Sequence, residues 1–356
     1  MDRRKELEIS ASLHDAIQEK LKEHYGDTPD QRIQDRVKAE WSAAEQSGSV
    51  VDIALLYEMS SYLKEQRYPW CLRGCTGSSF LLHLLGIARG NPLPPHLHCP
   101  RCHTVLWQDC ADGFDAKTVV CGVDHQMMMG DGHGVPWQSL WGYGELPPSF
   151  DIDLPKSLYE PLQATLREDR FSRYDPEMVL TIPYPSRVKM IKLRKISMLF
   201  NLHTKPMDEH FYNHSYSGID IQRMIRCWHD MIELEDWKQL APPKDFGDLC
   251  ALYGLLYSTG SWDNRTQRQI AHDGMKYAEL VSDREFIFHY LTRHGFLEKD
   301  AWTGMRAVQM GHPLPVVTEE MEVAQDSWVI SRCAEVQYLF PKAHAVERIL
   351  FNARNR

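Results

Sequence analysis

The sequence predicts an α+β protein that is mostly helical and built from several domains. Apolar residues recur at helical spacing near both ends of the 356-residue chain. Between these ends lie a stretch rich in Pro, Gly, Cys, His and Trp and a stretch of short alternating apolar and basic runs. The length and a hydrophobic content of 43% allow a substantial core, divided into about two or three domains.

The first segment, residues 1–85, is expected to be helical over most of its length. Apolar side chains return with a helical period in two groups, namely Leu13, Ile17, Leu21 and Tyr25, then Ile53, Leu56, Tyr57 and Leu63. Gly26, Asp27 and Pro29 separate the two groups, because these residue types favour turns over helix interiors. Residues 6–66 therefore predict amphipathic helices with a break near residue 27.

The second segment, residues 86–150, has little regular periodicity and is expected to be an irregular insert held together by a metal ion. It contains Cys99, Cys102 and Cys121 among the nine cysteines of the chain. No export signal is recognisable at the N-terminus, so we expect a cytoplasmic protein whose cysteines are thiols or metal ligands.

The third and fourth segments, 151–241 and 242–356, differ from each other. The third has the densest basic run, which is Arg187, Lys189, Lys192, Arg194 and Lys195. A solvated helix or strand face is the ordinary explanation of such a run. The fourth is predicted to be helical, with apolar stripes at Leu249, Leu252, Leu255 and Leu256 and at Phe286, Ile287, Tyr290 and Leu291.

Charge and hydropathy exclude two classes of protein. A formal net charge of -9 argues against a protein that coats DNA nonspecifically, because phosphate binding depends on Lys and Arg. A local basic face remains compatible with this charge. No apolar run reaches the roughly 18 residues of a membrane-spanning helix, so no membrane association is expected.

A series of short motifs resembles a known family. The motifs, in chain order, are Arg73-Gly74-Cys75-Thr76-Gly77-Ser78-Ser79-Phe80, Asn91-Pro92-Leu93-Pro94-Pro95-His96, Cys99-Pro100-Arg101-Cys102, Gly113-Phe114-Asp115, Asp131-Gly132-His133-Gly134 and Phe150-Asp151-Ile152-Asp153-Leu154. In residue type and order they resemble the palm of the PolC-type DNA polymerase III alpha subunit. Near the C-terminus, Tyr338-Leu339-Phe340-Pro341-Lys342-Ala343-His344-Ala345 is similar to the fingers segment of that family.

The resemblance implies a truncated relative with four parts. These are a helical palm-derived segment at 1–85, a zinc-binding insert at 86–150, a reduced remnant of a polymerase-beta-like palm at 151–241, and a helical fingers-like region at 242–356. Between residues 156 and 240 the similarity is thin, and family members have a much longer segment there that carries the third catalytic aspartate.

Asp151 and Asp153 are the candidate catalytic residues. Side chains alternate faces along a strand, so both carboxylates would point the same way. The resemblance implies that they hold Mg²⁺ for nucleotidyl transfer. An acidic surface turn is the alternative. Asp208 and Asp220 are only loose candidates for the third carboxylate.

The glycine-containing motif is a candidate nucleotide-binding segment made of Arg73, Gly74, Gly77, Ser78 and Ser79. Amides and hydroxyls at the start of the following apolar run could cradle a triphosphate, with Arg73 adding a charged contact. The alternative is a serine-capped helix that needs glycine only for its turn.

The resemblance also implies a zinc site in the insert. Cys99, Cys102 and Cys121 supply three ligands, and His125 is the expected fourth, because Cys₃His is a common structural zinc set. Asp124 and Cys110 are the other candidates. A vestigial knuckle held by ordinary packing is the alternative.

Lys342 and His344 lie in the fingers-like motif, where family members approach nucleotide or template. A basic residue at this place could neutralise phosphate charge. The alternative is a helix start after Pro341 that presents both side chains to solvent.

The sequence thus predicts a PolC-like derivative that takes part in DNA replication or binds DNA, with DNA and deoxynucleoside triphosphate as ligands and replication proteins as partners. Template-directed synthesis is expected to be weak or absent because the palm is incomplete. An active enzyme in which residues 156–240 supply a replacement carboxylate is a second hypothesis. A zinc-stabilised, non-catalytic interaction module of a replication apparatus is a third.

Overall fold

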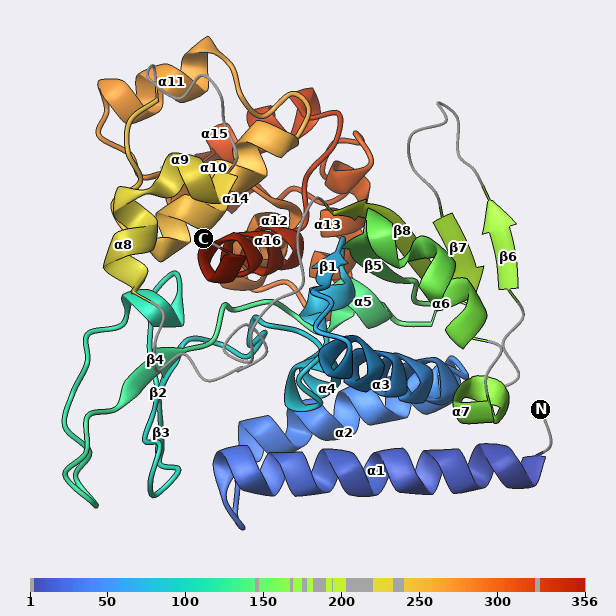
Figure 1. Cartoon of the computed structure of the whole chain (residues 1–356). Coiled ribbons are helices and arrows are strands. Elements are labelled where there is room, and N and C mark those ends of the chain that lie inside the picture. The colour runs from blue at the N-terminus through green and yellow to red at the C-terminus, as the bar shows by residue number, and fades with distance from the viewer. Residues whose placement is uncertain are drawn as a thin grey trace.

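The computed structural model describes residues 3–144, 147–166, 169–174, 178–181, 190–193, 195–202, 220–232, 240–323 and 327–355. It combines helices with two small sheets, which lie toward opposite sides of the view in Figure 1, and this confirms the α+β class. Among the described residues, no helix is both long and apolar enough to cross a membrane.

Three helices open the chain: α1 (Arg3–Tyr25), α2 (Gln31–Gln46) and α3 (Val50–Glu65). The sequence predicts two helices with one break, so the second break, between α2 and α3, is an addition to that prediction. The apolar stripe of α1, in which buried side chains recur every four residues, runs from Ile9 to Tyr25. Gly26 turns the chain with a φ of 76°, and the Asp30 side chain accepts the amide of Arg32 to cap α2. The predicted break between the two apolar groups is therefore real.

The larger sheet has the strand order β1-β5-β8-β7-β6. Its strands are β1 (Cys71–Arg73), β5 (Phe150–Pro155), β6 (Met178–Thr181), β7 (Met190–Leu193) and β8 (Ile196–Leu202). β5 pairs antiparallel with β1 and parallel with β8, so it lies between segments far apart in sequence. The register of β5 on β8 shifts between Leu154 and Pro155.

The smaller sheet belongs to the insert and has the order β3-β2-β4. Its strands are β2 (His96–His98), β3 (Val105–Trp107) and β4 (Met129–Asp131). The 3-10 turn η2 (Gly113–Asp115) packs on β4 so closely that a Cβ at Gly113 would lie 1.6 Å from the Asp131 carbonyl oxygen. Glycine is therefore required at this contact.

Short helices connect these parts, and longer ones complete the C-terminal third. The connecting elements are η1 (Thr76–Ser78), α4 (Phe80–Leu84), α5 (Gln138–Trp141), η3 (Lys156–Leu158), α6 (Tyr159–Thr165), α7 (Asp169–Ser172), α8 (Ile221–Arg226) and α9 (Trp228–Ile232). The C-terminal elements are α10 (Phe246–Tyr257), α11 (Asn264–Ala271), η5 (Tyr277–Glu279), α12 (Arg284–Arg293), α13 (Glu298–Gln309), α14 (Glu319–Val323), α15 (Trp328–Glu335) and α16 (Lys342–Asn355).

The hydrophobic cores cross the predicted segment boundaries. One cluster joins α1–α4 to β1, β5 and β8, and a second joins α8–α10 to α16. A third lies among α12, α13 and α15, and a small fourth surrounds Cys99 and Cys121. The division into four segments stays a prediction, but residues 1–85 and 151–202 contribute to one shared core.

Candidate functional site

Asp151 and Asp153 lie on β5, two residues apart and on the same face of the larger sheet. Arg73 of β1 stands opposite Asp151 in the antiparallel register. On the other side, β8 places Ser197 beside Asp151 and Leu199 beside Asp153. The amide of Asp151 donates to Thr76 Oγ1 at 2.9 Å, which ties the strand to η1. The strand geometry expected for this pair is therefore present.

Two arginines surround Asp153. Its carboxylate lies 3.3 Å from Arg73 Nη1 and 3.9 Å from Arg348 Nη1. The Asp153 side chain is only 4% exposed, whereas those of Arg73 and Arg348 are 35% and 21% exposed. Burial raises the pKa of Asp153, and the two arginines oppose that shift. The arginines thus cover the carboxylate and keep part of their own surface open to solvent.

Helix α16 brings Arg348 to β1, and α16 and β1 lie side by side in Figure 1. The buried carboxylate of Glu347 fixes this position, because it accepts the amides of Arg89 and Gly90 at 2.7 and 2.9 Å. A Cβ at Gly77 would lie 2.8 Å from Glu347 Cγ. The helix therefore rests directly on glycine backbone.

His344 and Lys342 go to different places. His344 stacks on Phe340, and burial, reinforced by Arg73 and Arg348, lowers its pKa to about 3. His344 is thus a neutral imidazole near the same two arginines. Lys342 Nζ donates to the Ala111 carbonyl at 3.3 Å and lies 3.9 Å from Asp112 Oδ2. Lys342 therefore faces η2 and is engaged there.

The two serines of the glycine-containing motif are buried and bonded within the chain. Ser78 Oγ donates to the Cys75 carbonyl at 2.6 Å. Ser79 Oγ donates to Glu40 at 2.7 Å and accepts the Leu82 amide at 3.3 Å, so it caps α4. Gly74 adopts a φ of 57° beside Asp151. In this conformation only Arg73 of the motif offers charged donors at the surface.

Of the two candidates for a third carboxylate, Asp208 lies outside the described residues. Asp220 caps α8 by accepting the Arg223 amide, and it pairs with Arg226 at 3.6 Å. On β8, alternation puts half-buried Asn201 on the face shared by Ser197, and its buried Oδ1 has no hydrogen-bond partner. Among the described residues of β8 there is no carboxylate.

The insert contains two turns of the same design. In one, the Cys99 amide donates to the Thr104 carbonyl and the His103 amide donates to the Cys99 carbonyl. In the other, Cys121 bonds Gln126 and His125 bonds Cys121 in the same way. His103 and His125 both adopt a φ of 60°. Asp124 therefore occupies in the second turn the place that Cys102 has in the first.

These turns bring four metal-ligand atoms together. The sulfur atoms of Cys99, Cys102 and Cys121 and a carboxylate oxygen of Asp124 all lie within 4.8 Å of one another. His125 is exposed and does not belong to this group, and Cys110 bonds the Asp112 carbonyl. The structure thus favours Asp124 over His125 as the fourth ligand. Three thiols and a carboxylate suit a tetrahedral zinc ion.

The residues of this group differ in how easily they ionise. Burial raises the pKa of Cys99 to about 11, whereas the Thr104 hydroxyl lowers the pKa of Cys102. Burial alone would raise the pKa of Asp124, but hydrogen bonds from the Gln126 amide and the Cys99 thiol lower it. All nine cysteines are free thiols, as expected for metal ligands and core residues.

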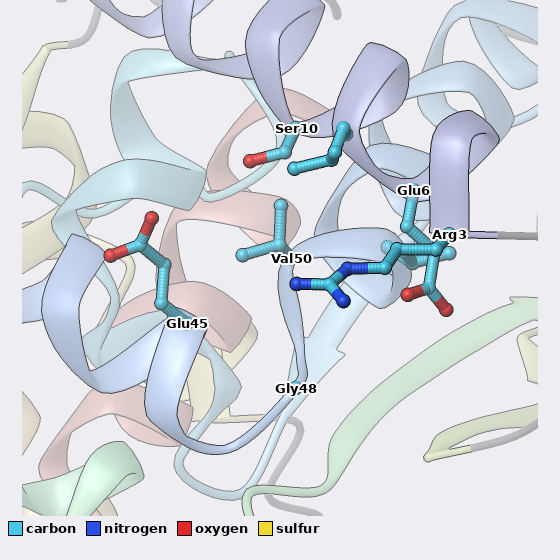
Figure 2. Close-up of a pocket in the computed structure, with 8 residues that line it drawn as sticks. Arg3, Glu6, Ser10, Glu45, Gly48 and Val50 are labelled. Atoms are coloured by element: carbon cyan, nitrogen blue, oxygen red, sulfur yellow. The ribbon is translucent and has the colours of Figure 1, made fainter.

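Sequence reasoning missed Arg348 and Asn201. Arg348 follows His344 by four residues, so helical spacing alone places the two on one face. No such signal pointed to Asn201, because its position beside the acidic pair depends on the parallel pairing of β8 with β5. A surface pocket of about 260 Å³ between the start of α1 and the α2–α3 turn involves none of these residues (Figure 2).

Several curated proteins that are similar to this chain share one name. No family model matches the chain. The chain is 25% identical to a DNA polymerase III PolC-type of Thermotoga maritima, over 91% of this chain and 32% of the relative. It is 24% identical to that of Caldanaerobacter subterraneus, over 94% and 32%, and 22% identical to that of Mycoplasma pneumoniae, over 92% and 30%.

These relatives place the chain in the class of DNA polymerase homologues. More specifically, the chain is a relative of DNA polymerase III PolC-type, and the predicted resemblance is confirmed. The chain spans about a third of the length of the curated relatives it matches. The alignment with the Thermotoga maritima protein covers 439 positions, more than the 356 residues of this chain, so the relative has residues that this chain lacks.

Proposed function

We propose that this chain is a cytoplasmic PolC-like replication protein that binds primer–template DNA and a deoxynucleoside triphosphate, with template-directed nucleotidyl transfer impaired. One observation carries the proposal. Asp151 and Asp153 of β5, Arg73 of β1 and Arg348 of α16 meet at a single place, although they lie far apart in sequence. Carboxylates on a strand can hold cations, and arginines beside them can contact phosphate, so this arrangement suits a polymerase-like ligand site.

Impaired transfer follows from the composition of this site. Two-metal phosphoryl or nucleotidyl transfer needs carboxylates that hold both cations in place. The described residues supply Asp151 and Asp153, and Asp153 is already paired with two arginines. The nucleotide contacts assigned to Arg73, Gly74, Gly77 and His344 belong to this proposal, and Arg348 joins them.

DNA binding is tested by the anisotropy of a fluorescent primer–template titrated with the full chain. We expect an affinity that falls at least about tenfold between roughly 50 and 200 mM salt, because each neutralised phosphate releases counterions. Heat-denatured protein serves as the blank. Absence of binding at low salt, or binding that salt leaves unchanged, would contradict the proposal.

Impaired synthesis is tested by primer extension with Mg²⁺, beside an Asp151→Ala, Asp153→Ala double variant. We expect the two proteins to extend the primer to the same negligible extent. Template-dependent incorporation that only the wild-type protein performs would show a working polymerase and would direct attention to a carboxylate outside the described residues.

The metal proposed for Cys99, Cys102, Cys121 and Asp124 is a structural zinc ion. A closed set of four protein ligands leaves no open position for chemistry, so its role is to stabilise the insert. Three of the four ligands are those expected from the sequence, and Asp124 replaces His125 in the proposal because of its position in the second turn.

A second function, a protein-interaction module, is favoured by a different observation. Several large apolar side chains of the insert are more than a third exposed: Leu106 (43%), Val119 (39%), Val120 (58%), Val123 (69%), Met127 (51%) and Met129 (43%). Exposed apolar side chains that lie together are typical of protein-binding surfaces, and within this set Val120 and Met127 pair directly. In this case the partner is a protein of the replication apparatus, and the DNA titration would show no salt-dependent binding.

A further inference from the structure

Two contacts join the two turns that carry the metal-ligand group. Cys99 Sγ donates to Asp124 and lies 3.3 Å from each of its carboxylate oxygens. Cys102 Sγ lies 3.5 Å from Cys121 Sγ. Each contact crosses from the first turn, which holds Cys99 and Cys102, to the second. The group therefore contains one thiol–carboxylate pair and one thiol–thiol pair.

These two pairs differ in their chemistry. Two thiols can be oxidised to a disulfide, whereas a thiol and a carboxylate cannot form such a bond. Asp124 has the place in its turn that Cys102 has in the other, so a carboxylate faces Cys99 instead of a thiol. The contacts thus favour a single disulfide between Cys102 and Cys121, with Cys99 left as a thiol.

Cys102 is the member of the thiol–thiol pair that a small oxidant can reach. Its side chain is half-buried, whereas Cys121 is only 1% exposed. The Thr104 hydroxyl lies 3.1 Å from Cys102 Sγ, where it can donate to a negatively charged sulfur. Because the thiolate is the form that reacts with oxidants and binds metals, Cys102 is placed to react first.

The reaction with hydrogen peroxide is balanced in two steps. The Cys102 thiolate attacks one peroxide oxygen, so an S–O bond forms, the O–O bond breaks and hydroxide leaves. The Cys121 thiolate then attacks Cys102 Sγ, so the S–S bond forms, the S–O bond breaks and a second hydroxide leaves. The sulfur atoms are oxidised and the peroxide is reduced. Since both thiolates are consumed, a zinc ion loses half of its ligands and is released.

The disulfide would preserve the link that the metal provides. Both connect the turn at 99–104 to the turn at 121–126, and the loop between residues 102 and 121 stays closed in either form. The contact of Cys99 with Asp124 needs neither zinc nor the other thiols. The insert therefore has two cross-linked states, one reduced with zinc and one oxidised without it.

We propose that the metal-ligand group is a redox switch, in which peroxide converts Cys102 and Cys121 to a disulfide and releases zinc while the insert stays folded. Disulfides in cytoplasmic proteins are usually transient and often serve redox sensing, which fits a switch of this kind. The inference rests on the proposed structural zinc ion and concerns the regulation of that same site.

Peptide mapping of the full zinc-loaded chain, treated with hydrogen peroxide and alkylated with N-ethylmaleimide, tests the pairing. Trypsin cuts after Arg101 and Lys117, so the three cysteines fall into peptides 90–101, 102–117 and 118–156. We expect peptide 102–117 linked to peptide 118–156, with the thiol of peptide 90–101 alkylated. Zinc released to a chromogenic chelator should match the linked peptide in amount, and dithiothreitol with added zinc should reverse both changes.

Three variants separate the candidate thiols. Peptide 102–117 also contains Cys110, so Cys110→Ser is the matched control and should form the same link. Cys99→Ser should keep the link although it loses zinc, whereas Cys121→Ser should lose both. Circular dichroism identifies any variant that fails to fold, and the peptide map of the wild-type chain decides the pairing without it.

Hydrogen exchange of the wild-type chain tests whether the insert stays folded. Amide protection in residues 96–131 should be similar in the zinc-loaded and oxidised proteins. It should fall about tenfold or more in reduced protein treated with EDTA, because neither cross-link is then present.

Three results would overturn the inference: a link that joins peptide 90–101 to either of the others, loss of the link in Cys110→Ser, or zinc release without a disulfide. Oxidised protein that exchanges as fast as EDTA-treated protein also overturns it. Absence of zinc from the reduced protein before oxidant is added contradicts the proposed structural zinc and the switch with it. Zinc that is present and is not exchanged for a disulfide contradicts the switch alone.

Discussion

The two candidate sites of the molecule are built in opposite ways. The metal-ligand group comes from residues 99–124 and depends on two local turns of the same design. The acidic site combines β1, β5, β8 and α16, whose residues span positions 73–348. In the first, Asp124 has the place in its turn that Cys102 has in the other turn. In the second, Asn201 brings an amide from β8 and Arg348 brings a positive charge from α16. A local site thus depends on a short stretch of sequence, whereas a distributed site depends on how distant segments pack.

Loss of a metal ligand should have the largest effect. Cys121→Ser or Asp124→Ala should abolish bound zinc and destabilise the insert by several kcal/mol, because structural zinc contributes on the order of 10 kcal/mol to small metal domains. Zinc content by mass spectrometry and thermal unfolding measure this. His125→Ala, in the same turn, should retain the metal. If His125→Ala loses zinc while Asp124→Ala keeps it, the ligand assignment is wrong.

Removal of the Glu347 carboxylate should destabilise the packing of α16 at the acidic site and leave the metal-ligand group unchanged. Glu347→Ala leaves the amides of Arg89 and Gly90 without their acceptor, and we expect a loss of about 3 kcal/mol in the free energy of unfolding. Urea titration measures it. Zinc content should stay unchanged, and Glu45→Ala on the exposed side of α2 should have no effect. Equal losses in the two variants would show that Glu347 does not fix α16.

Acid should weaken the contact between α12 and the loop after β4. Burial lowers the pKa of His289 to about 4, and its Nε2 lies 2.7 Å from the Gly134 carbonyl oxygen. The unfolded chain takes up this proton near pH 6.5 and the folded chain only near 4, so stability is complete above pH 6.5 and falls as pH decreases through that window.

His289→Gln, which keeps a donor for Gly134, should remove roughly 3 kcal/mol of this pH dependence. Urea unfolding at several pH values measures the slope for both proteins. An identical slope in the variant would exclude His289 as the source.

The smallest effect is expected for replacement of Ser79, which distinguishes a helix cap from a phosphate contact at this residue. Because Ser79 caps α4, Ser79→Ala should lower the free energy of unfolding by about 1 kcal/mol. The affinity for dATP should not change, because the hydroxyl is buried against Glu40. A variant with normal stability and weak dATP binding would instead support the phosphate-cradle interpretation.

Sequence reasoning succeeded where a property is local. Helical spacing gave the buried stripe of α1, and strand alternation gave the common face of Asp151 and Asp153. Three members of the metal-ligand group, Cys99, Cys102 and Cys121, were singled out by their residue types. Spacing could have placed Asp124 ahead of His125, since Asp124 follows Cys121 by the same three positions that separate Cys99 from Cys102.

The remainder depended on pairings that no local pattern reveals. Nothing within residues 196–202 indicates that β8 lies parallel to β5 and places Asn201 near Asp153. The contact of Arg348 with Asp153 joins residues from distant parts of the chain and requires α16 to pack on β1. The serines looked suited to phosphate in sequence, but Ser79 donates to buried Glu40 and Ser78 donates to the Cys75 carbonyl.

The contact between α16 and glycine backbone also ties separate interactions to one packing surface. A Cβ at Gly90 would lie only 2.6 Å from Val346 Cγ1, so the close approach of α16 depends on glycine at this position. A larger residue there would push the helix outward. That displacement would strain both amide bonds of Glu347 and the contact of Arg348 with Asp153 together.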